Sequence, residues 1–264
     1  MVLLFMGTAF AQTSTIPKLF FYDDFHGKYI NPLKWSSQWM CGTSTVMECE
    51  RNIEGGHLAL HVRNYGDNVE NQGMQFGNSL LYLNVDATDI STDVTVQSAK
   101  AQSCPANPGG AHAQVLLSGH FFSDGGLTWD NDMIAFLQLD HYPTDPGDEV
   151  EVGGFLQYQG QFFANVYLGP AKLGDRINVE LKWDQPNHQF VVSMFQPRTG
   201  TITEALMPYE APEIAPPVFP YKGLSANAFS PNCTSGVTFA DSKAYFDNVR
   251  TNVPMPTVLE SRPK

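Results

Sequence analysis

The 264-residue sequence predicts an all-β protein folded as one antiparallel β-sandwich. Short runs that alternate apolar and polar residues are separated by clusters of Gly, Pro, Asn and Asp, which is typical of sandwich domains. No segment shows a convincing helical period. Because sandwiches of about 200–250 residues commonly form single units, we expect one domain rather than two.

The alternating runs define the expected strands. The clearest is 176–183, where Ile177 and Val179 would face the core while Asn178 and Glu180 face solvent. The stretch 207–221 contains five prolines, which cannot donate ladder hydrogen bonds, so we expect a rigid connection there, with a lid over a groove as the alternative. The expected strands are 19–25, 57–62, 79–83, 93–101, 112–122, 133–141, 149–158, 161–168, 176–183, 189–195 and 244–250.

The two ends of the chain fall outside the expected sandwich domain of 12–250. Residues 1–11 resemble the end of a secretory signal, with apolar residues at 2–6 and an Ala9-Phe10-Ala11 cleavage site, although a buried strand is the alternative. Residues 251–264, rich in proline, are expected to form a flexible tail. No other apolar run approaches the roughly 18 residues of a membrane span. We therefore expect a secreted protein, extracellular or periplasmic.

The four cysteines suit an exported protein, since disulfides persist in oxidising compartments. Three pairings are possible. We favour Cys41–Cys49 with Cys104–Cys233, because the first closes a short loop and leaves the other two to connect distant loops. Zinc is a poor alternative, since no C-x2-C spacing is present.

The chain is acidic, with a formal net charge of -12 and a pI near 4.8. Nucleic acids and anionic membranes would be repelled, so neither is an expected partner. Strongly acidic polysaccharides are disfavoured for the same reason, because no run of Lys or Arg offers a basic patch.

Two segments at opposite ends of the chain carry a family resemblance. The first is Phe21-Tyr22-Asp23-Asp24-Phe25, followed by Trp35 and by a Gly55-Gly56 turn into the strand 57–62. The second is the expected closing strand, 243–249. Together they resemble the concanavalin A-like jelly-roll superfamily of legume-lectin-like domains, laminin-G-like domains and family 16 glycoside hydrolases. The resemblance implies a jelly roll, and either carbohydrate binding or glycoside hydrolysis, because one fold can host both.

Polar side chains follow one face of three consecutive expected strands. A face this polar does not suit a core, where each group would need a buried partner, but it suits a groove that hydrogen-bonds sugar hydroxyls. The alternative is an ordinary solvated outer face. Tryptophans in expected loops would add stacking platforms for a sugar, or else pack within their loops. The expected ligand-binding residues are Trp39, His112, Gln114, Trp129, Gln138 and Gln157.

The carboxylates decide between a binding module and an enzyme. Family 16 enzymes carry a Glu-x-Asp-x-x-Glu strand motif, which 148–155 resembles, with Glu149 and Glu151 on one face. The assisting Asp is replaced by Glu, and Gly154 stands three residues beyond Glu151, so the second catalytic acid is missing. Asp140 on the neighbouring strand is a possible cross-strand partner for Glu149 or Glu151, in catalysis, in calcium binding or as plain surface charge.

The resemblance also implies a structural calcium site, with Gly56 at the glycine turn and Asp247 on the closing strand supplying oxygen ligands. The alternative is that Asp247 caps a turn or pairs with a neighbour. The sequence thus predicts a secreted domain that binds a polysaccharide or glycan, and it favours a binding module over an enzyme. A divergent glycoside hydrolase or polysaccharide lyase, and an extracellular adhesion domain, remain as alternatives; the oligomeric state is not predicted.

Overall fold

The computed structural model describes residues 19–36, 47–66, 73–82, 86–105, 110–231, 233 and 238–254. Regular structure in these ranges is almost entirely β-strand, and the 3-10 helices η1 (Trp129–Asn131) and η2 (Gln185–Asn187) have three residues each. The predicted all-β class is therefore confirmed. None of the described helices has the length and apolar character needed to cross a membrane.

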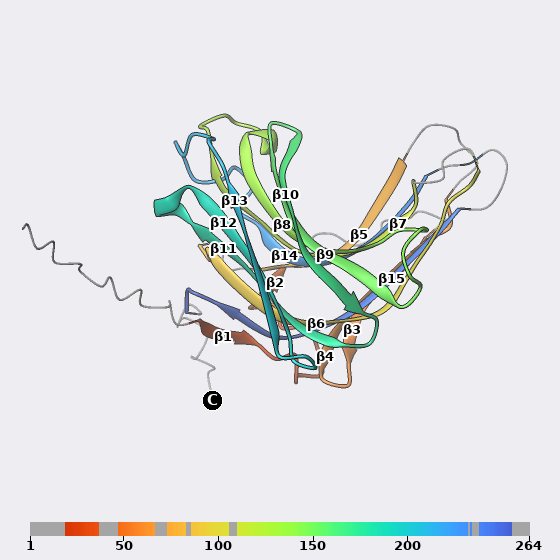
Figure 1. The fold of residues 1–264 in the computed structure, drawn as a ribbon. Coiled ribbons are helices and arrows are strands. Elements are labelled where there is room, and N and C mark those ends of the chain that lie inside the picture. The colour runs from red at the N-terminus through yellow and green to blue at the C-terminus, as the bar shows by residue number, and fades with distance from the viewer. Residues whose placement is uncertain are drawn as a thin grey trace, which may run out of the picture.

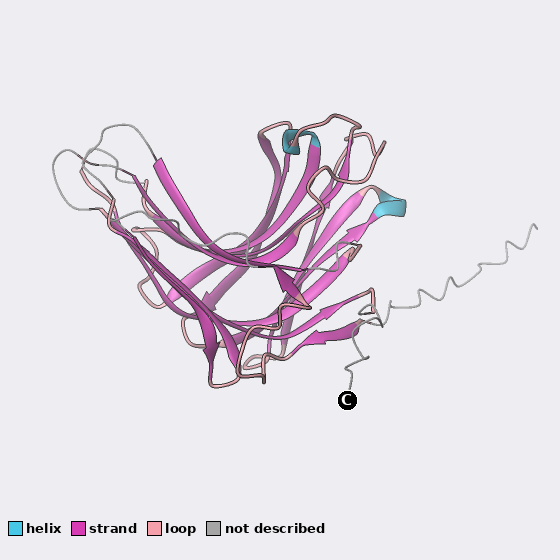
Figure 2. Ribbon diagram, turned by 180° about the vertical axis from the view of Figure 1, so that it is seen from behind, coloured by secondary structure: helices cyan, strands magenta, loops and turns pink. Residues whose placement is uncertain are grey.

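Two antiparallel sheets pack face to face, and both curve in the same direction (Figures 1 and 2). The convex sheet has the order β13-β12-β11-β6-β15-β4-β3, with β1 also paired to β15. The concave sheet has the order β10-β9-β8-β7-β14-β5-β2. The convex strands are β1 (Phe20–Asp23), β3 (Met47–Glu54), β4 (His57–Asn64), β6 (Asp89–Gln102), β11 (Arg176–Asp184), β12 (Gln189–Gln196), β13 (Thr201–Pro208) and β15 (Phe239–Thr251). The concave strands are β2 (Trp35–Ser36), β5 (Gly73–Tyr82), β7 (His112–Ser123), β8 (Asp132–His141), β9 (Glu149–Tyr158), β10 (Gln161–Lys172) and β14 (Lys222–Pro231).

The core lies between the sheets and is filled from both by alternate residues. On β11, Ile177 and Val179 are buried while Asn178 and Glu180 are partly exposed, as the alternation predicts. On β7, Val115 is one of the residues that face the core from the concave sheet. The residues that alternate with Val115 on β7, such as Gln114, point away from the core and lie on the outer face of the concave sheet.

The two segments that carry the family resemblance lie together in the structure. β1 pairs with the end of β15, and β2 pairs with β5 of the other sheet. Tyr22, Phe25, Trp35 and Tyr82 form one buried aromatic cluster, with ring centroids 4.7 to 5.4 Å apart. This cluster connects the edges of the two sheets.

Four of the described strands lie outside the expected set: β2, β3, β13 and β14. The expected loop 207–221 was placed slightly too early, because Met207 and Pro208 end β13 and pair with Phe190 and Gln189 of β12. The remainder, 209–221, has no strand, although Ser123 of β7 exchanges backbone hydrogen bonds with Ala215. This Pro-rich segment therefore runs beside the edge of β7.

Of the two expected disulfides, the one between Cys104 and Cys233 is present. Cys41 lies outside the described residues, so its pairing with Cys49 stays a prediction. Trp39, the signal-like residues 1–11 and most of the expected tail also lie outside them. Within the described part, β15 extends to Thr251, one residue past the expected end of the domain.

Candidate functional site

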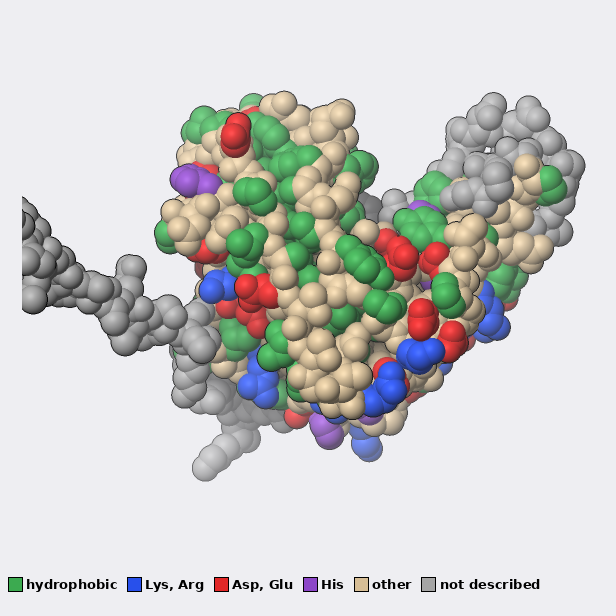
Figure 3. All heavy atoms as spheres, in the orientation of Figure 1, with side chains coloured by type: hydrophobic (Ala, Val, Ile, Leu, Met, Phe, Trp, Pro, Cys, Tyr) green, Lys and Arg blue, Asp and Glu red, His purple; other side chains and the backbone are tan. Residues whose placement is uncertain are grey.

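The outer face of the concave sheet brings most of the predicted site residues together. The cross-strand register places Gln114 of β7 beside Asp140 of β8, and Asp140 beside Glu151 of β9. Gln138 and Gln157 lie on the same face by alternation along β8 and β9. Figure 3 shows a hollow between two lobes of the molecule, with acidic side chains near its lower end. The predicted polar face therefore exists.

Three side-chain amides form a hydrogen-bonded row across this face. The Asn227 amide on β14 donates to Gln114 Oε1 at 3.0 Å, and the Gln114 amide donates to Gln138 Oε1 at 3.3 Å. Asn227 was not among the predicted residues, because its strand was not recognised. Amides carry both donors and acceptors, so such a row can donate hydrogen bonds to sugar hydroxyls and accept hydrogen bonds from them.

His112 lies two residues before Gln114 on β7, in an aromatic setting. Its ring stacks on Phe229 with centroids 4.9 Å apart and lies 5.2 Å from the Tyr142 ring. Burial lowers the pKa of His112 below the usual value, so the ring is neutral at pH 7. The predicted ligand contact is thus a largely packed side chain.

Asp140 is the most unusual carboxyl on the face. Its side chain is 3% exposed, and its Oδ1 atom has no hydrogen-bond partner in the described part of the chain. Burial raises the pKa of Asp140 to about 7; the neighbouring Gln114 amide opposes the rise, whereas the charges of Glu151 and Asp145 add to it. Asp140 is therefore a carboxyl that can hold a proton near neutral pH, next to the exposed Glu151.

The other predicted carboxylate, Glu149, lies at the start of β9 and is paired across the sheet with Lys172 of β10. Its Oε1 atom is 3.3 Å from Lys172 Nζ, which also pairs with Asp148 at 2.7 Å. A Cβ atom added to Gly154 would lie 3.1 Å from the Val192 side chain of the convex sheet, so this position faces the core. The motif position that lacks an acid consequently has no room for one.

A cavity of about 380 Å³ occupies another part of the concave face. Trp129 from η1 and Phe219 from the Pro-rich segment form its aromatic side and are 47% and 41% exposed. Ser118 and His120 of β7 and Ser225 of β14 supply polar groups. Trp129 is the predicted ligand residue found here, whereas Phe219 was missed because its segment had been assigned only a connecting role.

Asp132 fixes the aromatic side of this cavity. The carboxylate is fully buried and accepts the backbone N–H groups of Val218 at 2.7 Å and Phe219 at 2.9 Å. His120 Nδ1 lies 2.9 Å from Asp132 Oδ2, and the His120 backbone N–H donates to Tyr221 O at 2.9 Å. The buried Asp132 at the start of β8 thus attaches the Pro-rich segment to the sheet in addition to the backbone hydrogen bonds from β7.

Lys222 is a buried cation in the lining of the same cavity. Its Nζ atom donates to the His120 carbonyl at 3.1 Å and lies 5.0 Å from the centre of the Phe121 ring. Burial lowers the pKa of Lys222 to about 8, and the charge of Asp86 opposes that effect. The amine is therefore mostly protonated at pH 7.

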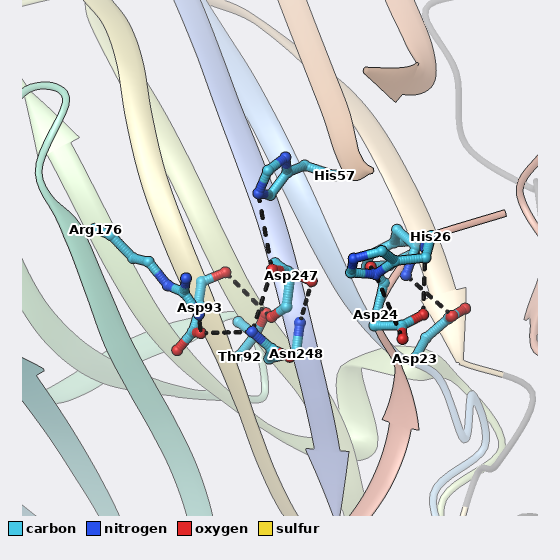
Figure 4. Close-up of polar contacts among 10 residues, drawn as sticks. Asp23, Asp24, His26, His57, Thr92, Asp93, Arg176, Asp247 and Asn248 are labelled. Atoms are coloured by element: carbon cyan, nitrogen blue, oxygen red, sulfur yellow. Dashed lines mark hydrogen bonds and ion pairs between the residues drawn. The ribbon is translucent and has the colours of Figure 1, made fainter. Parts of the chain in front are cut away.

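The predicted calcium residues lie at the other side of the sandwich: Asp247 is on β15 of the convex sheet (Figure 4), and Gly56 is in the turn between β3 and β4. Asp247 Oδ1 accepts the Asn248 backbone N–H at 2.8 Å, and Oδ2 lies 3.8 Å from His57 Nε2. Gly56 occupies the turn before β4 with φ of +85°, a conformation that favours glycine. No group of three or more His, Cys, Asp or Glu side chains among the described residues is arranged to hold a metal. Calcium takes six to eight oxygens, so backbone carbonyls and water would have to supply most of them; the site stays a prediction.

Neither a protein-family model nor a curated protein matches this chain. Among solved structures it is similar to lectin II from Ulex europaeus, at 13% identity and a TM-score of 0.36, over 81% of this chain and 96% of that one. It is similar to winged bean acidic lectin in complex with methyl-α-D-galactose, at 12% and 0.39, over 89% and 98%. It is also similar to the GlcNAcα1-4Gal-releasing endo-β-galactosidase from Clostridium perfringens, at 11% and 0.49, over 89% and 61%. At such identities a likeness describes the fold alone. The sheet order itself shows a two-sheet antiparallel β-sandwich, as predicted for a jelly roll.

Proposed function

We propose that this protein binds a carbohydrate on the outer face of its concave sheet. The observation that carries the proposal is the cavity in which the half-exposed Trp129 and Phe219 stand beside the polar groups of Ser118, His120 and Ser225. Sugar rings have apolar faces that stack on aromatic rings and hydroxyl edges that need hydrogen-bond partners. The amide row on the same face adds further partners.

The charges around this face favour a neutral carbohydrate. Glu151, Asp145 and the partly ionised Asp140 are acidic, whereas Lys172 is already paired with Asp148 and Glu149. A polyuronate would meet these carboxylates and the net charge of -12. We therefore propose a neutral polysaccharide or glycan as the ligand class.

The Pro-rich segment bears on the adhesion alternative. That alternative would gain support if 209–221 filled the groove and left no space for a ligand. Phe219 and Tyr221 instead line the cavity of about 380 Å³. Since this space remains open, the arrangement favours a ligand-binding module.

Replacing Trp129 by Ala is the direct test of carbohydrate binding. We expect the wild-type protein to be retarded in native gels containing galactan, dextran or laminarin, and Trp129→Ala to lose about tenfold in affinity, because one sugar-stacking surface is gone. The matched control is Tyr29→Ala, since Tyr29 is 83% exposed and not part of the cavity lining. Equal retardation of Trp129→Ala and wild type would refute this site.

Asp140 and Glu151 support a second candidate function, a divergent glycoside hydrolase or polysaccharide lyase. A carboxyl with a pKa of about 7 can donate a proton near neutral pH, and an exposed carboxylate on the next strand can act as base or nucleophile. If the face is catalytic, wild type should clear a zone in a gel cast with a neutral polysaccharide (hydrolase) or a polyuronate (lyase), and Glu151→Gln should clear none while still being retarded. Clearing by the variant at the wild-type rate would rule this pair out.

Two further proposals follow from the sequence. We propose export of the chain, which amino-terminal sequencing of the native protein would test by locating its first residue relative to Gln12.

We also propose calcium near Gly56 and Asp247. The test is the thermal midpoint in calcium and in chelator, and a midpoint that is the same in both would argue against the metal.

A further inference from the structure

We propose that His120 contacts the bound carbohydrate as a hydrogen-bond acceptor, and that Asp132 fixes the orientation of the imidazole ring and the nitrogen that carries its hydrogen. The inference rests on the proposed function. It adds one requirement for the ligand: a hydroxyl group in the cavity that donates its hydrogen to His120 Nε2.

The Asp132 contacts determine which ring nitrogen carries the hydrogen. Asp132 is fully buried, and two of its three partners are the backbone N–H groups of Val218 and Phe219, which can only donate. The third partner is His120 Nδ1, 2.9 Å from Oδ2. Because the carboxylate accepts from its other partners, the nitrogen facing it carries the hydrogen and donates as well.

The second nitrogen of the ring then has a lone pair to offer. Burial lowers the pKa of His120, the charge of Lys222 lowers it further, and Asp132 opposes both effects, so the ring is neutral at pH 7. A neutral imidazole with its hydrogen on Nδ1 is an acceptor at Nε2. Within the described part of the chain, Nε2 has no hydrogen-bond partner.

The surroundings make this acceptor available to a ligand. The His120 side chain is 21% exposed and lines the cavity together with Trp129 and Phe219, whose ring centre is 6.4 Å from that of His120. A sugar ring stacked against the aromatic side would bring its hydroxyl edge to the polar residues. His120 therefore discriminates for a free hydroxyl at that position, and a substituted one would leave Nε2 without a donor.

The proposal predicts that acid weakens binding. Protonation puts a hydrogen on Nε2 and converts the acceptor into a donor, so affinity is full above the His120 pKa and falls about tenfold per pH unit below it. The charged groups that face the ring are Asp132 from β8 and Lys222 from β14, with Asp86 next to Lys222. Lys222, with a pKa of about 8, does not titrate in the acid range. Asp140, with a pKa of about 7, lies on the same sheet, so variants are needed to distinguish its titration from that of His120.

A pair of matched substitutions isolates Nε2. In His120→Asn the amide nitrogen takes the place of Nδ1 and keeps a donor for Asp132, but no atom replaces Nε2. In His120→Gln the amide oxygen can take the place of Nε2 as an acceptor that does not titrate. At pH 7 we expect His120→Asn to bind about tenfold more weakly than wild type. His120→Gln should bind within a few-fold of wild type and lose the acid-dependent fall, while Asp140→Asn should retain that fall.

The measurement is the affinity for galactan, dextran and laminarin by gel retardation between about pH 5 and 7, with thermal midpoints recorded for every variant. Equal binding by both His120 variants at pH 7, or a wild-type acid profile in His120→Gln, would overturn the proposal. If wild type binds none of the polymers, the proposed function itself fails and this inference fails with it. If Trp129→Ala is no longer retarded but both His120 variants are retarded as strongly as wild type, this inference alone would be overturned.

Discussion

Asp132→Ala is expected to lower the free energy of unfolding by about 3 kcal/mol and to remove most of the carbohydrate affinity. The substitution leaves the backbone N–H groups of Val218 and Phe219 without their acceptor, and an unsatisfied buried donor costs about 1–3 kcal/mol. It also frees His120 from its partner. The Pro-rich segment would keep its backbone hydrogen bonds to β7 but lose its attachment to β8, which positions Phe219 on the aromatic side of the cavity.

Urea denaturation and gel retardation measure the two effects on the same preparation. Asp130→Ala is the matched control, because it removes the same charge from an exposed neighbour two residues away and should leave both readouts near wild type. Asp132→Asn keeps one acceptor oxygen and should lie between wild type and Asp132→Ala in stability. A stability change below about 1 kcal/mol for Asp132→Ala would show that the two N–H groups find other acceptors.

The strands that could be predicted from the sequence are those whose side chains alternate. β11 shows the reason, since its buried Ile177 and Val179 face one core and its polar residues face water. β14 was missed because Gly223, Ser225, Ala226 and Asn227 look like a loop. These small residues are buried between β7 and β5 at the centre of the concave sheet. A strand with small side chains on both faces gives no alternation of hydrophobicity to detect.

Part of the candidate site could likewise be predicted from the sequence, and part could not. Gln114, Gln138 and Gln157 could be placed on one face from alternation within single strands. The cavity could not be predicted, because Phe219 reaches it through a hydrogen bond to Asp132 across 87 positions of sequence. Nor could the burial of Asp140, which depends on its neighbours across the sheet.

Trp35→Ala is expected to lower the free energy of unfolding by about 4 kcal/mol, as is usual for a fully buried tryptophan. The indole is 3% exposed, stacks on Phe25 at 5.4 Å and lies 4.7 Å from the Tyr82 ring. Its Nε1 atom donates to Asp23 Oδ2 at 2.6 Å. Because Asp23 belongs to β1 and Tyr82 to β5, the substitution weakens the contact between the edges of the two sheets.

Trp35→Phe separates packing from hydrogen bonding. It retains an aromatic ring but leaves Asp23 with one donor fewer, so a loss of about 1–2 kcal/mol is expected. Trp129→Ala provides the contrast, since its half-exposed ring should contribute much less to stability than to binding. Urea midpoints of the three variants test this order. If Trp35→Ala and Trp129→Ala were equally stable, the aromatic cluster would not hold the two sheets together, because a buried cluster with that role must respond to the loss of its largest member.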